Sequence, residues 1–247
     1  MAAHLPYCGT PPSPESLLVR FNLDPVLIAA LLALALLHLH YLRRQGGLPT
    51  AVTGWLLTGA ALISPLCALS VSLFCARVGQ HMLLILCAAP LLALGTPQVS
   101  DRWARQNVWL STLSFFVALW FWHMPGPYDA TFDRTLTYWA MHLTLFGSAV
   151  ALWRALLRSP RQMSGDVLLA GVLTSMQMGF LGAILTTASR PLYFRHLATA
   201  PLWGLTPLQD QQLGGTLMWV PGIVLFLGAA LYALGRLRSL AERANAT

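Results

Sequence analysis

Residues 25–42 read PVLIAALLALALLHLHYL, an apolar run without a single Asp, Glu, Lys or Arg. A helix needs about 20 mostly apolar residues to cross the hydrocarbon core of a membrane. Further apolar runs of similar length follow along the chain, at 51–74, 78–96, 107–124, 135–157, 166–188 and 211–235. The pattern predicts an all-α, polytopic membrane protein, built as a bundle of seven transmembrane helices.

The composition excludes a soluble fold. Hydrophobic residues make up 56% of the chain, charged residues only 9%, and the mean hydropathy is +0.62. Soluble domains carry about 25% charged residues. The net charge of +7 comes from arginine alone, and these arginines lie in short segments between apolar runs rather than on a basic stripe. We therefore expect a lipid environment and no nucleic-acid partner.

The arginine distribution predicts the orientation. With seven spans, the connecting segments alternate sides; one set holds ten arginines and the other five. Positive residues are retained on the cytoplasmic side, so we expect the N-terminus outside and the C-terminus inside. The domains are then an external tail over residues 1–24, a transmembrane domain over 25–236 and a cytoplasmic tail over 237–247. The first tail lacks the charged and apolar regions of a signal peptide.

Some residues interrupt or flank the expected spans. Pro65 and Pro90 fall inside two of them and predict kinks. The segment 125–134 is expected to be a short external loop, with Asp129 and Asp133 as solvated turn residues.

The four cysteines form no CxxC pair and no zinc spacing. We expect Cys67 and Cys87 to be small core residues, and Cys8 and Cys75 to lie nearer a surface.

Three histidines suggest a site. His81, His123 and His142 lie in or beside apolar runs, and the predicted topology puts all three toward the external side. Met82 and Met124 directly follow two of them, and imidazole with thioether favours copper. The alternative is a polar packing network, because histidines in membranes often hydrogen-bond to neighbouring helices.

A second polar region is TPLQDQQLGGTLMWVPG, residues 206–222. Asp210 lies where the last span begins and is expected to cap that helix; alternatively, it faces the histidines as a metal ligand or as a partner of one. Gly214 and Gly215, like Gly182 in the preceding span, predict close helix packing. The chain has no GxSxG, HExxH or phosphate-binding loop, so we do not expect an enzyme.

Four segments carry a family resemblance: HMLLILCAAPLLALGTP (81–97), FWHMPGPYDATF (121–132), YWAMHLTLFGSAVALW (138–153) and DQQLGGTLMWVPG (210–222). Together they resemble the CtaG-type cytochrome c oxidase assembly factors, multi-span bacterial membrane proteins, over residues 50 to 235. The resemblance implies a multi-pass protein of the bacterial inner membrane that helps to mature a haem–copper oxidase. It also implies oxidase subunits and periplasmic copper chaperones as partners, and copper as the cargo. The candidate ligands are then His81, His123, His142, Met82, Met124 and Asp210.

The chain departs from the family pattern at one point. Family members carry a His-Met pair just ahead of the histidine that matches His81, and here the pair reads Arg77 and Val78. A buried arginine would repel a cation, or it would form an ion pair with Asp210.

Other functions remain open. In a haem- or quinone-binding electron carrier, two bundle histidines would ligate haem iron. A copper permease would need polar groups across the whole bilayer, and the cytoplasmic half offers mainly His38 and His40. A scaffold for oxidase subunits would need no metal.

Overall fold

The computed structural model describes residues 5–43, 46–96, 100–160 and 163–245. Two of the arginines counted for the orientation, Arg44 and Arg161, lie outside these ranges. Within them the chain is helical and contains no β-strand. The main helices are α1 (Pro25–Leu42), α2 (Leu48–Ile63), α3 (Pro65–Ser72), α4 (Phe74–Met82), α5 (Ala89–Gly95), α6 (Asp101–His123), α7 (Pro125–Asp133), α8 (Thr135–Arg158), α9 (Ser164–Thr187) and α10 (Pro207–Asn245). A π-helical segment, η2 (Leu83–Ala88), joins α4 to α5, and short 3₁₀ turns are η1 (Leu17–Val19), η4 (Phe194–His196) and η5 (Ala200–Trp203).

Five of the spans, α1, α4 to α5, α8, α9 and α10, are long and apolar enough to cross a membrane. Two bent pairs raise the number to seven if each counts as one span. The chain bends by 49° between α2 and α3, and by 75° between α6 and α7. Each bend falls directly before a proline, Pro65 or Pro125, whose ring disfavours the helical conformation at the residue before it. The expected loop 125–134 is therefore wrong, because residues 125–133 form helix α7.

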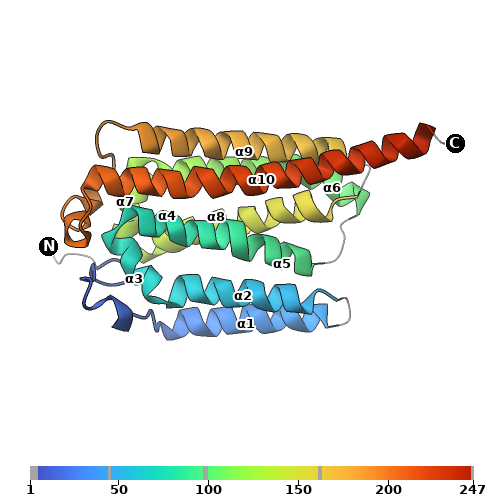
Figure 1. Cartoon of the computed structure of the whole chain (residues 1–247). Coiled ribbons are helices and arrows are strands. Elements are labelled where there is room, and N and C mark those ends of the chain that lie inside the picture. Colours follow the sequence, from blue (N-terminus) through green and yellow to red (C-terminus); the bar gives the residue numbers. More distant parts are fainter. Residues whose placement is uncertain (1–4, 44–45, 97–99, 161–162, 246–247) are drawn as a thin grey trace.

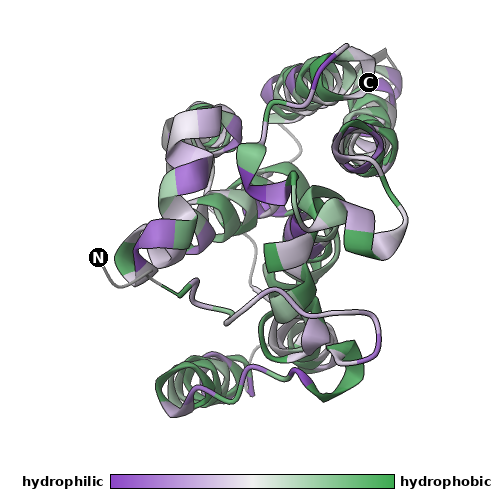
Figure 2. Ribbon diagram, turned by 90° about the vertical axis from the view of Figure 1, so that its left-hand side faces the viewer, coloured by the Kyte–Doolittle hydropathy of each residue, from purple (hydrophilic) through white to green (hydrophobic). Residues whose placement is uncertain are grey.

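The long helices run side by side, with the two termini at opposite ends of the bundle (Figure 1). One end carries the N-terminal segment, α3, α7 and the loop between α9 and α10; we call it the tail end. Seen along the helices from this end, hydrophilic residues gather on the short helices and loops, while the long helices behind them are largely apolar (Figure 2).

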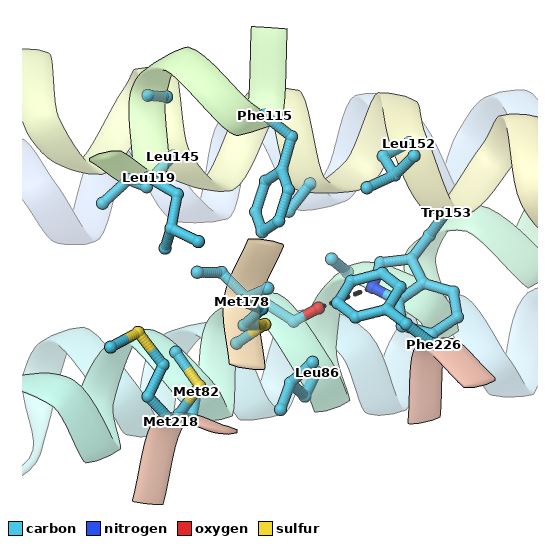
Figure 3. Packing of buried hydrophobic residues seen from close by; sticks show 14 of the residues in the cluster. Met82, Leu86, Phe115, Leu119, Leu145, Leu152, Trp153, Met178, Met218 and Phe226 are labelled. Carbon is cyan, nitrogen blue, oxygen red and sulfur yellow. Dashed lines mark hydrogen bonds between the residues drawn. The ribbon is translucent and has the colours of Figure 1, made fainter. Parts of the chain in front are cut away.

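The central core is built around aromatic and methionine side chains (Figure 3). The rings of Trp153 and Phe226 stack at 4.7 Å, and the indole of Trp153 donates to the carbonyl of Ile85 at 2.7 Å. In the π-helical segment, the Ala89 N–H bonds to the Leu84 carbonyl five residues back. The next donor in this series would be Pro90, which has no N–H. Trp153 therefore satisfies the carbonyl that Pro90 leaves without a partner.

Helices α9 and α10 approach closely at two glycines. A Cβ atom on Gly215 would lie 2.8 Å from the Gly182 carbonyl oxygen, and one on Gly182 would lie 3.0 Å from that of Gly215. No other residue fits at either position without moving the helices apart. The prediction of close packing at these glycines is confirmed.

Candidate metal centre

The three histidines gather near the tail end. His81 comes in the last turn of α4, His123 ends α6, and His142 lies two turns into α8. The ring centroid of His81 is 5.3 Å from that of His142 and 6.1 Å from that of His123. All three side chains are buried, with 3–5% of their surface exposed. Three separate helices thus bring three imidazoles to one place inside the bundle.

Backbone hydrogen bonds fix two of the three rings. His123 Nδ1 lies 2.7 Å from the Leu119 carbonyl oxygen, and His142 Nδ1 lies 3.1 Å from that of Tyr138. A carbonyl only accepts, so Nδ1 carries the proton in both neutral rings and Nε2 keeps a lone pair. Histidines that bind metals characteristically donate their other N–H to a carbonyl in this way.

The third ring has no partner. Both ring nitrogens of His81 and Nε2 of His142 are buried without a hydrogen bond. A buried polar group without a partner costs about 1–3 kcal/mol, so such atoms need an explanation. A cation bound between the rings would use these lone pairs.

The present arrangement is not a coordination sphere. No group of three or more His, Cys, Asp or Glu side chains is arranged to hold a metal ion in the described ranges. The void beside His81 and His142 is too small for a water molecule. The rings would have to turn and close on an ion.

The two methionines do not line this void. Met82 packs in the apolar core near Leu86 and Met218 (Figure 3). Met124 precedes α7 and has 53% of its surface exposed.

Asp210 caps a helix, but not its own. Its two oxygens accept from the backbone N–H groups of Phe74 at 2.8 Å and Cys75 at 2.9 Å, at the start of α4. Leu73, at the N-cap position, has an apolar side chain that cannot accept a hydrogen bond from these N–H groups. Asp210 of α10 thus supplies the cap of the helix that carries His81 and does not itself enter the histidine cluster.

Arg77 lies one turn before His81 with 1% of its surface exposed. Its guanidinium donates to Thr131 Oγ1 at 2.6 Å and to the Ser70 carbonyl at 3.3 Å, and lies 4.1 Å from the ring centroid of Phe132. Arg77 and Asp210 form no ion pair, although the structure describes both. The positive charge of Arg77 is stabilised by these hydrogen bonds and by the cation–π contact with Phe132.

The loop between α9 and α10 folds over the tail end. His196 Nδ1 lies 3.1 Å from the Ser72 carbonyl oxygen, and its Nε2 lies 2.6 Å from the Tyr128 hydroxyl. Burial lowers the pKa of His196 to about 3. Tyr193 donates to the carbonyl of His123 at 2.7 Å. His196 thus holds the loop against α3 and α7, and Tyr193 joins the same loop to α6.

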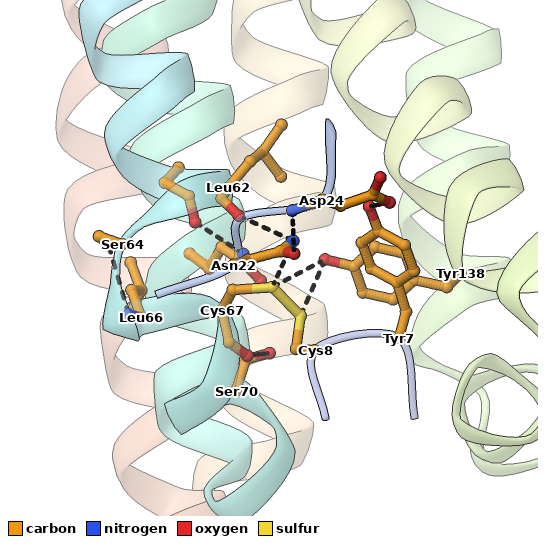
Figure 4. Close-up of a disulfide and its surroundings, with 12 residues drawn as sticks. Tyr7, Cys8, Asn22, Asp24, Leu62, Ser64, Leu66, Cys67, Ser70 and Tyr138 are labelled. Atoms are coloured by element: carbon orange, nitrogen blue, oxygen red, sulfur yellow. Dashed lines mark hydrogen bonds between the residues drawn. A yellow bond between two sulfur atoms is a disulfide. The ribbon is translucent and has the colours of Figure 1, made fainter. Parts of the chain in front are cut away.

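A disulfide joins the N-terminal segment to α3, between Cys8 and Cys67 (Figure 4). The sequence interpretation missed it, because Cys67 was expected to be a core residue. The signal was present: the predicted topology placed Cys8 and the end of the second span on the same side. Cys67 is buried as expected, but Cys75 is buried and Cys87 is exposed, so the expectations for these two free thiols are wrong.

The family comparison agrees with the sequence resemblance. A family model described as cytochrome c oxidase caa3 assembly factor matches residues 48–239. The N-terminal segment and α1 lie outside the match. No curated protein and no solved structure matched the chain. Since the match covers well over half of its length, the chain belongs to the cytochrome c oxidase caa3 assembly factor (Caa3_CtaG) family.

Proposed function

We propose that this protein handles copper for a haem–copper cytochrome c oxidase, at the periplasmic side of the bacterial inner membrane. His81, His123 and His142 take up the ion, and the protein passes it toward an oxidase subunit, receiving it from a periplasmic copper chaperone. It catalyses no reaction of its own. One observation carries the proposal: His81 has two ring nitrogens without partners, beside two rings whose Nδ1 atoms are fixed by carbonyls.

The donor set fits the ion. Three neutral imidazoles can bind copper, as imidazole is a ligand of both copper and zinc. Copper enters here as cargo, so weak or incomplete coordination is an advantage for transfer. The buried charge of Arg77 lowers the affinity further by repulsion.

The proposed topology has seven spans, counting each bent pair as one, with the external tail over residues 1–24 and the cytoplasmic tail over 237–247. The ten-to-five arginine bias supports the N-terminus outside. The disulfide at the tail end supports the same orientation, since disulfides form in oxidising compartments such as the periplasm. The histidine cluster would then lie in the periplasmic half of the membrane.

A haem carrier is the less favoured alternative. The void beside His81 and His142 does not admit a water molecule, whereas a porphyrin would have to pass between two axial ligands.

Metal analysis with an optical spectrum tests the proposal. The purified full chain, loaded with Cu(I) under anaerobic conditions and desalted, should retain about one copper per chain and show no haem absorption. His81→Ala should lose the ion. His40→Ala is the matched control, because His40 is exposed near the opposite end of the bundle. Equal copper in the wild type and His81→Ala, or a haem spectrum, would refute the proposal.

A further inference from the structure

The Cys8–Cys67 disulfide lies beside the histidine cluster. Tyr7, the neighbour of Cys8, packs against Tyr138 and Trp139 of α8, with ring centroids 4.8 and 5.1 Å apart. The Tyr138 ring lies 4.2 Å from the His142 ring, and the Tyr138 carbonyl fixes His142 Nδ1. One residue, Tyr138, therefore separates the sulfur pair from the proposed copper ligands.

Hydrogen-bond donors surround the two sulfur atoms (Figure 4). The Tyr138 hydroxyl lies 3.4 Å from Cys8 Sγ and 3.7 Å from Cys67 Sγ. It must be the donor, because disulfide sulfur carries no proton. The Asn22 amide also donates to Cys67 Sγ at 3.6 Å. Disulfide sulfur is a weak acceptor, whereas a thiolate gains considerably from such donors. These surroundings suit sulfur that carries negative charge.

Cys8 is partly exposed at the tail end, whereas Cys67 is fully buried. Cys8 lies on a segment without regular helix. The Pro12 carbonyl accepts from Ser72 Oγ at 3.2 Å, and the Asn22 N–H bonds to the Ile63 carbonyl at 2.8 Å. These contacts, whose partners lie on either side of Cys67 in the chain, would hold the N-terminal segment near α3 after the S–S bond breaks.

We propose that the reduced Cys8–Cys67 pair is a second site for a soft monovalent metal ion, Cu(I), which it holds beside the histidines. A dithiol reductant transfers two electrons and two protons to the S–S bond, yielding two thiols, and is itself oxidised to a disulfide. Binding of Cu(I) then displaces both thiol protons and gives a bis-thiolate complex with one negative charge. Soft thiolate ligands favour Cu(I), as they do zinc and iron–sulfur clusters, and two of them are enough to bind Cu(I). The identity of the metal rests on the proposed function, while the site itself rests on the sulfur pair.

The test compares oxidised and reduced full-length protein. Each is titrated anaerobically with Cu(I) against a coloured Cu(I) chelator, after a small dithiol has reduced one sample and has been removed. The reduced protein should bind one Cu(I) more than the oxidised protein. Cys67→Ser and Cys8→Ser should each lose this additional ion. Cys87→Ser, which removes an exposed thiol elsewhere, should keep it.

Two further variants make the outcome unambiguous. Tyr138→Phe should weaken the additional site about tenfold, since a hydrogen bond to a charged group is lost. His81→Ala should keep the additional ion. One Cu(I) in both the oxidised and the reduced protein would overturn the inference and leave the proposed function standing, whereas none in either would contradict both. An additional ion without any in the oxidised protein would support the inference and contradict the histidine site.

Discussion

Replacing Asp210 by Asn tests whether α10 holds α4 in place. The first N–H groups of a helix have no partner within the helix, and those of Phe74 and Cys75 each donate to one oxygen of Asp210. Asparagine keeps one acceptor oxygen but presents an NH₂ group to the other N–H. One hydrogen bond is lost, and one buried donor then faces another donor.

The size of the effect follows from these two contacts. A hydrogen bond to a charged group contributes about 1.5–3 kcal/mol, and a buried donor without a partner costs about 1–3 kcal/mol. We expect Asp210→Asn to lower the free energy of unfolding by about 2–4 kcal/mol, and Asp210→Ala by more. For a chain of this length, 1 kcal/mol corresponds to about 2–4 °C in Tm, so Tm should fall by about 5–15 °C.

Tryptophan fluorescence during heating in detergent measures the shift. Asp133→Asn is the matched control, because Asp133 pairs with Arg195 where both side chains are 40–50% exposed, and exposed pairs contribute about 1 kcal/mol or less. A Tm loss in Asp210→Asn no larger than that of the control would refute the capping role. Copper retention in the same variant should fall together with Tm, since the cap positions the helix that carries His81.

Four other outcomes are expected. A reporter active only in the cytoplasm, fused after Thr247, should work and a periplasmic one should stay silent; the reverse would invert the topology. Gly215→Ala should destabilise the protein by about 1–3 kcal/mol through overpacking, whereas Gly228→Ala, with open space around its Cβ position, should leave Tm unchanged or raise it. Because burial holds the pKa of His196 near 3 while an unfolded histidine titrates near 6.5, the unfolded state binds more protons below pH 6.5. Stability should therefore be fully present above pH 6.5 and fall as the pH drops toward 3, and His196→Gln should flatten this dependence; an unchanged pH profile would contradict it. Deleting the gene should lower oxidase activity at limiting copper without loss of oxidase transcripts, and normal activity would count against the assembly role.

The sequence predicted the helices wherever hydrophobicity alone decides the structure. The first span has the predicted bounds, 25–42, and the eighth helix differs from prediction by one residue at its end. The apolar residues of α7 were misread, because Pro125 and Gly126 in a short segment are typical of a loop. A proline at the first position of a helix is equally common, and only tertiary packing distinguishes the two.

The candidate site was predicted in part. The hydropathy pattern gives depth in the membrane, and depth was enough to group His81, His123 and His142. The pattern does not give the direction in which a side chain points around its helix, so it did not indicate that Met82 packs in the core. Asp210 was expected to cap the helix of its own span and instead caps α4, an arrangement that depends on contacts between residues far apart in the chain. The predicted topology placed Cys8 and Cys67 on the same side of the membrane, but their pairing depends on the same kind of long-range contact.

The π-helical segment between His81 and α5 has a consequence for how this span tolerates change. It holds one residue more than an α-helix of the same rise and the same number of turns, because a π-helical turn contains more residues than the 3.6 of an α-helical turn. Deleting one residue of Leu83–Ala88 would therefore restore a regular helix and keep the two halves in phase. Deleting a second residue would rotate one half by about 100°, so that either His81 would turn away from His142, or α5 would turn away from α2 and α8, against which it packs. The segment thus tolerates the loss of one residue, and a larger change in its length alters the angular phase between the candidate metal ligands and the opposite half of the bundle.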